Sequence, residues 1–202
     1  MTVILLLRHG QSTWNLEGRW QGRADPPLTE WGEGQAVAAA NQLGAADGIV
    51  SSPLQRAYRT AELLAERLGI GPIGVMDDLA ERDVGPWSGL TTPEIEQRWP
   101  GAIRAAQWPE GFEAEIAVQG RALRALASIH ERFEGGDVVA LSHGGLIRMV
   151  ERHFDSPSGH FPNLSGRTVV IDGKGIRLGD RLDLAPPAET GEAGGATPVQ
   201  RL

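Results

Sequence analysis

The sequence predicts an α/β domain in which helices cover both faces of a sheet. Two observations predict it. Short apolar runs alternate along the chain with segments of helical period, and the first run, residues 3–7, is apolar at every position. A strand without polar alternation is typical of a parallel sheet that is buried on both faces, and strand–helix alternation is the pattern of α/β domains. The 202 residues suffice for one domain with a full core.

The expected strands are short apolar runs that end at glycine, proline, serine or charged residues. The run VVAL is a clear case, because four apolar residues stand between an aspartate and a serine. The final two runs are joined by Gly-Lys-Gly and read as a hairpin. The predicted strands are residues 3–7, 48–52, 73–76 and 137–141, followed by a hairpin over 168–172 and 176–178.

The expected helices begin and end at recognisable residues. Thr29 has the side chain of an N-cap, and good helix formers continue from it to Gly44. Pro53 stands at the start of a second helix, which ends at Gly69, and Pro100 follows a short third one. The predicted helices are residues 29–43, 54–68, 91–98, 113–134 and 145–153.

Composition excludes several classes of function. The chain has no cysteine, which excludes disulfides, thiolate metal sites and cysteine nucleophiles and fits a reducing, cytoplasmic location. The net charge of −7 argues against a nucleic-acid partner. No signal-peptide pattern or membrane-length apolar run is visible, so we expect no membrane partner. We expect one domain over residues 1–184 and a disordered Pro/Gly/Ala/Glu-rich tail over 185–202.

Three predicted strands end in residues that suit a phosphate group. The first ends in Arg8-His9-Gly10 and the fourth in Ser142-His143-Gly144, and Arg56 follows the second. In an α/β sheet, ligands bind beyond the carboxyl ends of the strands. Arginine forks bind phosphate oxygens bidentately, and backbone N–H groups beside glycine can approach a ligand closely. These residue types at these places predict a pocket for a phosphate dianion.

The same residues suggest covalent chemistry. Positive charge nearby disfavours the imidazolium form, so one of the two histidines can stay neutral and attack phosphorus. The leaving alkoxide then needs an acid, and Glu81, just after the third strand, is the best-placed candidate. Each feature alone is weak, and their coincidence carries the interpretation. Surface or capping roles are expected for His130 and His153, and His160 receives no role.

Five motifs then resemble the histidine phosphatase superfamily, the group of cofactor-dependent phosphoglycerate mutases and their phosphatase relatives. The resemblance covers about residues 3–180, and the motifs come in the order and spacing of the family. They are RHGQSTWN at 8–15, GRWQGRADPPLTEWGEGQA at 18–36, SSPLQRAYRTAE at 51–62, ERDVGPWSGLT at 81–91 and LSHGG at 141–145.

The resemblance implies a fold and a set of roles. The fold would be a three-layer α/β/α sandwich with a mostly parallel central sheet. His9 would be phosphorylated during turnover and Glu81 would be the proton donor, and neither a metal nor a cofactor would be needed. The rest of the phosphate- and substrate-binding set would be Arg8, Arg56, His143, Asn15, Gln21, Gly22 and Gly144.

One segment departs from the pattern of the family. Many relatives carry Gly-Glu-Ser before the long helix, whereas residues 109–114 here read PEGFEA and lack the serine. This segment lies where the substrate-covering insertion of the family would be, so its chemistry cannot be copied from relatives. The part that residues 100–114 play in covering the site therefore stays open.

The resemblance favours the phosphatase branch. A mutase excludes water and holds a phosphorylated intermediate with extra cations, but residues 87–111 offer only Arg98 and Arg104. We therefore expect a phosphomonoesterase that acts on a small phosphorylated substrate. The alternatives are a phosphoglycerate-mutase-type phosphotransferase and a non-catalytic phospho-ligand binding module. Sugar phosphates, phosphoglycerate derivatives and α-ribazole phosphate are all open as substrates, and a homodimer is open as the oligomeric state.

Tryptophans are expected near the mouth of the site, where they would favour a partly apolar alcohol. The alternative is that several of them simply pack in the core. The candidates are Trp14, Trp20, Trp87, Trp99 and Trp108.

Overall fold

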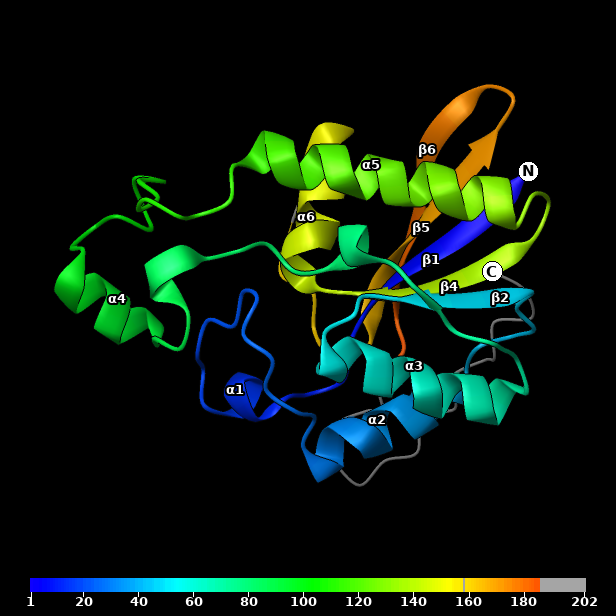
Figure 1. Ribbon diagram of the computed structural model, residues 1–202, viewed down its shortest axis with the longest axis horizontal. Coiled ribbons are helices and arrows are strands. Elements are labelled where there is room, and N and C mark those ends of the chain that lie inside the picture. The colour runs from blue at the N-terminus through cyan, green and yellow to red at the C-terminus, as the bar shows by residue number, and fades with distance from the viewer. Residues whose placement is uncertain (158, 186–202) are drawn as a thin grey trace.

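The computed structural model describes residues 1–157 and 159–185 and contains one mixed six-stranded sheet (Figure 1). The strand order is β3-β2-β4-β1-β5-β6. Strands β1, β2, β3 and β4 pair in parallel, and the hairpin β5–β6 joins β1 in antiparallel pairing. The bounds are β1 Thr2–Arg8, β2 Gly48–Ser51, β3 Gly74–Val75, β4 Asp137–Ser142, β5 Ser165–Asp172 and β6 Gly175–Asp183.

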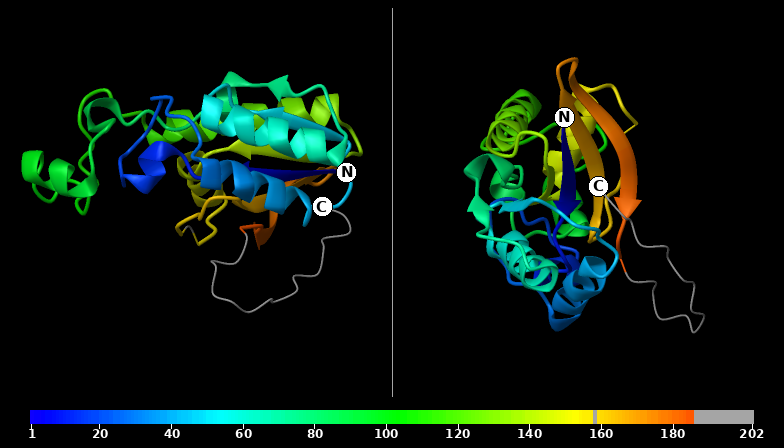
Figure 2. Two further views of the ribbon diagram at one scale, coloured as in Figure 1. Left: turned by 90° about the horizontal axis from the view of Figure 1, so that it is seen from below. Right: turned by 90° about the vertical axis from the view of Figure 1, so that its right-hand side faces the viewer.

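Helices cover both faces of the sheet, which confirms the predicted three-layer α/β/α architecture. In Figure 1, α5 and α6 lie above the sheet, and α2 and α3 lie below it. Shorter helices lie beyond one end of the sheet (Figure 2). The bounds are α1 Thr13–Leu16, α2 Glu30–Ala40, α3 Gln55–Leu68, α4 Thr92–Arg98, α5 Glu115–Arg132 and α6 Gly144–His153, with 3₁₀ turns at Asp77–Leu79 and Gly85–Trp87.

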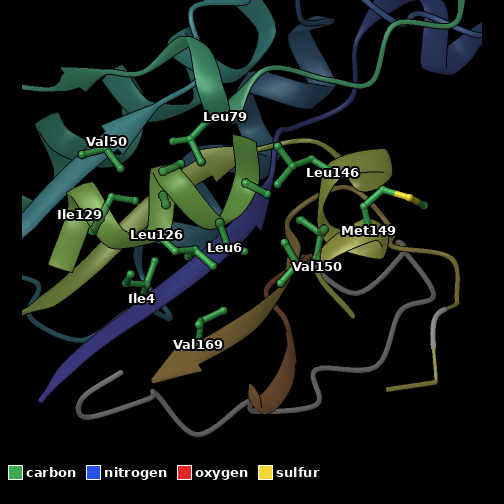
Figure 3. Packing of buried hydrophobic residues seen from close by; sticks show 14 of the residues in the cluster. Ile4, Leu6, Val50, Leu79, Leu126, Ile129, Leu146, Met149, Val150 and Val169 are labelled. Atoms are coloured by element: carbon green, nitrogen blue, oxygen red, sulfur yellow. The ribbon is translucent and has the colours of Figure 1, made fainter. Parts of the chain in front are cut away.

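The continuous apolar run of β1 is explained by the two helical layers. Ile4 and Leu6 pack with α5 and α6 in one core cluster (Figure 3). Leu5 and Leu7 pack with α2 and α3 in a second cluster on the opposite face. Because successive side chains of a strand point to opposite faces, both sets must be apolar when both faces are covered. The four residues are fully buried.

A third, smaller cluster lies beyond the sheet and supports the segments around α4. Its buried members are Val84, Trp87, Ile95 and Ala102. The Trp87 ring is completely buried and makes edge contacts with Trp20 and Trp108. This cluster gives the loops between β3 and α5 a core of their own. Figure 1 shows α4, which contributes to it, beyond the end of the sheet where β1 ends.

The boundaries that the sequence predicts differ most at the terminal hairpin and the long helix. The hairpin strands extend over 165–172 and 175–183, because the polar edge strand β6 gives a weak apolar signal. The long helix begins at Glu115, and Glu113 precedes it as part of a loop. The predicted disordered tail lies outside the described residues from residue 186 onward. Among the described residues, no helix is long and apolar enough to cross a membrane.

An ion pair between a buried glutamate and an exposed arginine fastens the hairpin to α6. Glu151 is completely buried and accepts hydrogen bonds from Arg181 Nε and Nη2 at 2.8 and 2.5 Å. Arg167 Nη1 lies 3.8 Å from the same carboxylate. The Arg181 guanidinium also lies over the Phe161 ring, 4.4 Å from its centroid. The hairpin therefore supports the segment between α6 and β5 as well as the edge of the sheet.

We expect Arg181→Ala to lower the free energy of unfolding by about 3 kcal/mol, because it leaves a buried carboxylate with one distant partner. Arg177→Ala is the matched control on the same strand, since its ion pair with Asp172 is exposed and such pairs contribute at most about 1 kcal/mol. Urea unfolding of both variants measures the difference. Equal losses would contradict the structural role of the Glu151 pair.

Candidate active site

The parallel pairing of β1 with β4 places the two predicted histidines side by side. Arg8 stands opposite Ser142 in the register, so His9 and His143 leave the same edge of the sheet together. Their ring centroids are 5.1 Å apart. Both side chains are buried, His9 at 3% exposure and His143 at 0%. The two strand-end motifs therefore form one site.

Hydrogen bonding fixes the tautomer of His9. Its Nδ1 lies 2.6 Å from the Gly10 carbonyl oxygen, which can only accept, so we assign the ring proton to Nδ1. Nε2 then keeps its lone pair, and Arg56 Nε donates to it at 3.2 Å. Burial, together with the charges of Arg56 and Arg8, lowers the pKa of His9 well below its usual value of 6.5. A neutral imidazole whose Nε2 carries no proton is the form that can attack phosphorus.

Backbone carbonyls hold the two arginines of the site. Arg56 is 1% exposed and donates through Nη1 to the Ala24 carbonyl at 2.6 Å and through Nη2 to the Gly22 carbonyl at 2.9 Å. Arg8 donates through Nη1 to the Phe161 carbonyl. Burial lowers the pKa of each arginine to about 10, so both remain charged at neutral pH. Carbonyls orient these guanidinium groups without cancelling their charge.

Gly22 has a structural reason for being glycine. Its φ is +49°, and a Cβ atom there would lie 2.7 Å from Val84 Cγ2 and 2.9 Å from Val84 N. Any larger residue would displace the carbonyl that orients Arg56. Gly22 also lines the cavity described below. It therefore contributes to the site through its backbone.

His143 lies behind His9 and is not part of the cavity wall. Its Nε2 is 2.8 Å from Ser52 Oγ, and its Nδ1 has no hydrogen-bond partner among the residues that the structure describes. Burial, with the charges of Arg56 and Arg8, lowers the pKa of His143 well below 6.5. The ring is thus neutral.

Asn15 and Gln21 line the cavity with their side chains already oriented. Asn15 Oδ1 accepts from Ser12 N at 3.1 Å and from Asn163 Nδ2 at 3.2 Å. Gln21 Oε1 accepts from Ser12 Oγ at 2.9 Å. Because both carbonyl oxygens are engaged, the NH₂ ends are the donors left for an anionic ligand.

Glu81 is held at the start of α6. Its Oε1 accepts from Arg82 N at 2.7 Å and Leu146 N at 3.1 Å, and its Oε2 accepts from Gly145 N at 3.0 Å. A Cβ atom on Gly145 would lie only 2.2 Å from Glu81 Oε1, so the carboxylate needs glycine at that position. Glu81 lines the same cavity as His9, on the side formed by α6.

A cavity of about 270 Å³ joins these groups. His143 excepted, every predicted site residue lines it. Its other walls combine cationic and aromatic side chains. These are Arg19, Arg82, Arg148, Arg152 and His160, with Trp20, Trp108 and Phe112.

The structure decides between the two alternatives that the sequence left open for the tryptophans. Of the five tryptophans, Trp20 and Trp108 line the cavity, whereas Trp87 is a core residue. The cations of the rim come from helix α6 and from loops on either side of the site, not from residues 87–111. Nothing in the local sequence marks Arg148 and Arg152, because only the packing of α6 turns them toward the site.

Two supporting residues escape sequence reasoning. Thr60 Oγ1 accepts from Gly10 N at 3.1 Å and donates to the Arg56 carbonyl at 2.7 Å, which ties α3 to the histidine loop. Asn163 Nδ2 donates to the His9 carbonyl at 2.9 Å. Thr60 stands one helical turn after Arg56, which is a faint signal, and Asn163 comes from 154 residues away and offers none.

Comparisons with known proteins point to one family. The model of the histidine phosphatase superfamily (branch 1) matches residues 4–175. A glucosyl-3-phosphoglycerate phosphatase of Mycobacterium tuberculosis is 38% identical over 179 residues, which cover 81% of this chain and 80% of that protein. A metal-independent phosphoserine phosphatase of Arabidopsis thaliana is 35% identical over 160 residues, covering 74% and 67%.

A solved structure is similar over nearly the whole described chain. It is a mycobacterial glucosyl-3-phosphoglycerate phosphatase in complex with VO3, with a TM-score of 0.76 and 32% identity. The match covers 87% of this chain and 96% of that one. The similarity therefore includes the sheet and the loops that form the cavity.

We expect Gly145→Ala to lower kcat/KM for an alkyl phosphate on the order of 100-fold, because the new methyl group displaces the Glu81 carboxylate. Gly120→Ala on α5 is the control, since a Cβ there lies no closer than 3.8 Å to any atom outside its own helix backbone and immediate chain neighbours. Steady-state kinetics with β-glycerophosphate compare the two variants. Unchanged activity in Gly145→Ala would show that the position of the Glu81 carboxylate is unimportant for catalysis.

Proposed function

This chain is a phosphatase of branch 1 of the histidine phosphatase superfamily, and we propose that it hydrolyses small phosphorylated metabolites through a phosphohistidine at His9, without a metal ion. The observation that carries the proposal is the neutral His9 imidazole, whose Nε2 faces the buried, charged Arg56. Such an imidazole is a nucleophile placed beside a phosphate-binding cation. The described residues contain no cluster of three or more side chains suited to a metal ion.

In the first step, the phosphate group of the substrate binds to Arg8 and Arg56, with Asn15 and Gln21 as further donors. His9 Nε2 attacks phosphorus, the P–N bond forms and the ester P–O bond breaks. Glu81 transfers a proton to the departing alkoxide oxygen, so the alcohol leaves neutral. The fixed guanidinium charges stabilise the negative charge on the equatorial oxygens in the transition state.

In the second step, water replaces the alcohol. The Glu81 carboxylate takes a proton from the water, whose oxygen attacks phosphorus and breaks the P–N bond. Inorganic phosphate leaves, and His9 returns to its neutral form. One carboxyl group thus serves as acid in the first step and as base in the second.

Hydrolysis, as opposed to phosphoryl transfer to a second metabolite, is favoured because three of the four rim arginines are paired with carboxylates. Arg19 pairs with Glu17 and Glu94. Arg82 and Arg152 both pair with Glu115. A mutase would need such cations free to hold a second phosphate.

The similar proteins also favour hydrolysis, since their names describe phosphatases of glucosyl-3-phosphoglycerate and phosphoserine. Metabolites of this kind are made inside cells, and we propose the cytoplasm as the location. A screen of phosphorylated metabolites, with release of inorganic phosphate as the readout, tests the class of substrate and identifies the preferred alcohol.

We expect His9→Ala to abolish turnover, because it removes the imidazole that lies beside Arg56 and is proposed to carry the phosphoryl group. His153→Ala, an exposed histidine at the end of α6, should keep the activity of the wild type. Acid-labile phosphate on His9 in enzyme quenched during turnover is the direct measurement. Activity of His9→Ala within tenfold of wild type would contradict the mechanism.

We expect Glu81→Gln to harm alkyl esters far more than aryl esters. General acid catalysis is worth about 10²–10⁴-fold, but p-nitrophenolate leaves with little help, whereas an alkoxide needs the proton. The measurement is kcat/KM for β-glycerophosphate and p-nitrophenyl phosphate, with the exposed Glu110→Gln as control. If both substrates lose the same factor, Glu81 is not the acid.

A further inference from the structure

A buried arginine on α5 binds the backbone of the segment that carries Glu81. Arg121 is 6% exposed and does not line the cavity. Its Nη1 donates to the Asp78 carbonyl at 3.0 Å and to the Ala80 carbonyl at 2.5 Å. The guanidinium group therefore fixes the chain immediately before Glu81.

The partner of Arg121 fixes the chain after Glu81. Glu113 accepts a two-pronged pair of bonds from Arg121, Nε to Oε1 at 2.8 Å and Nη2 to Oε2 at 3.1 Å. The same Oε2 accepts from Asp83 N at 3.0 Å, and Glu113 N donates to the Asp83 carbonyl at 3.0 Å. The Glu113 carbonyl also accepts from Arg82 Nε at 2.7 Å.

From this arrangement we propose that the buried Arg121–Glu113 pair positions Glu81 for proton transfer. Its bonds fasten the backbone at residues 78, 80 and 83, and Glu81 lies between them. The carboxyl group of Glu81 meets α6 on its far side. The proposal rests on the proposed function, because it takes Glu81 to be the acid. Arg121 and Glu113 are positioning residues and touch neither substrate nor His9.

Glu113 is itself unsuited to act as an acid. Burial alone would raise its pKa, but the hydrogen bonds from Arg121 and from the Asp83 amide outweigh burial and hold the pKa below the usual value. Both of its carboxylate oxygens accept hydrogen bonds from the charged Arg121 guanidinium, whereas those of Glu81 accept from backbone N–H groups. The negative charge of Glu113 is therefore fixed, which suits a residue that holds Arg121 and Asp83 in place.

The pair supports the acid but not the nucleophile. His9 and Arg56 are held by Gly10, Gly22, Ala24 and Thr60, through bonds that do not involve α5. A purely structural role would be met as well by apolar residues of similar volume, since burying two charges is costly. Weakening the Arg121–Glu113 pair should thus impair proton donation by Glu81 selectively. A misplacement of about 1 Å can cost on the order of 100-fold in rate.

The test is Arg121→Lys, which keeps the charge but not the two-pronged geometry. We expect kcat/KM for β-glycerophosphate to fall about 10- to 100-fold, while kcat/KM for p-nitrophenyl phosphate stays within about threefold of wild type, since a stabilised phenolate needs little help from an acid. Arg124→Lys is the matched control. This exposed residue, three positions along α5, binds the Asp78 carboxylate and not the backbone. It should leave both substrates unchanged.

A second variant and a double variant sharpen the result. Glu113→Gln should show the same selective loss, because one end of the amide must face a donor. In a Glu81→Gln background, Arg121→Lys should cause no further loss with β-glycerophosphate, since there is no acid left to position. Thermal melting of each variant accompanies the kinetics.

The outcomes separate this proposal from the proposed function. If Glu81→Gln shows no preference for the leaving group, the assignment of the acid fails. If Glu81→Gln harms the alkyl ester more than the aryl ester but Arg121→Lys and Glu113→Gln do not, only the positioning role of the Arg121–Glu113 pair is refuted. Equal loss with both substrates, a full additional loss in the double variant, or failure of both single variants to fold would make the pair structural and overturn the proposal.

Discussion

The site depends on the register between the parallel strands β1 and β4. Because Arg8 faces Ser142, the residues that follow each strand leave the sheet at one point. Just beyond the strand ends, the side chains of His9 and His143 meet, and their ring centroids are 5.1 Å apart. A one-residue shift of β1 against β4 would turn His9 and His143 toward opposite faces of the sheet, away from each other. The apolar layers above and below, which fix that register, are therefore part of how the site is built.

Positive charge is handled in two different ways in this protein. Arg8 and Arg56 are held by carbonyl oxygens, which orient the guanidinium groups and leave their charge available. Arg121 is held by the Glu113 carboxylate, which neutralises its charge within the fold. The first arrangement keeps His9 neutral and attracts a dianion. The second stabilises a loop geometry. The chemistry of the partner, and not the arginine itself, separates binding from support.

The proposed nucleophile and the proposed acid are supported by separate parts of the structure. His9 stands on the sheet and is tied to α3 through Thr60. Glu81 stands on the segment between β3 and α4, which α5 and α6 hold through Arg121 and Gly145, with Gly145 making room for its carboxylate. The cavity is the space between these two bodies. Such a division lets the rim vary with the substrate while the distance from nucleophile to phosphate stays fixed by the sheet.

The sequence by itself determined the α/β class, the ends of β1 and β4 to within one residue, and the strand-end residues that meet at the site. These are local properties: an apolar run, a cap, or a histidine beside glycine is readable where it stands. Tertiary structure alone decided that Asn163 reaches the His9 carbonyl, that Arg121 ties down the Glu81 loop, and that Trp87 is core while Trp108 lines the cavity. It also decided that His143 lies behind His9. These contacts join residues from tens to more than a hundred positions apart, and no periodicity of the chain encodes which distant surfaces will pack together.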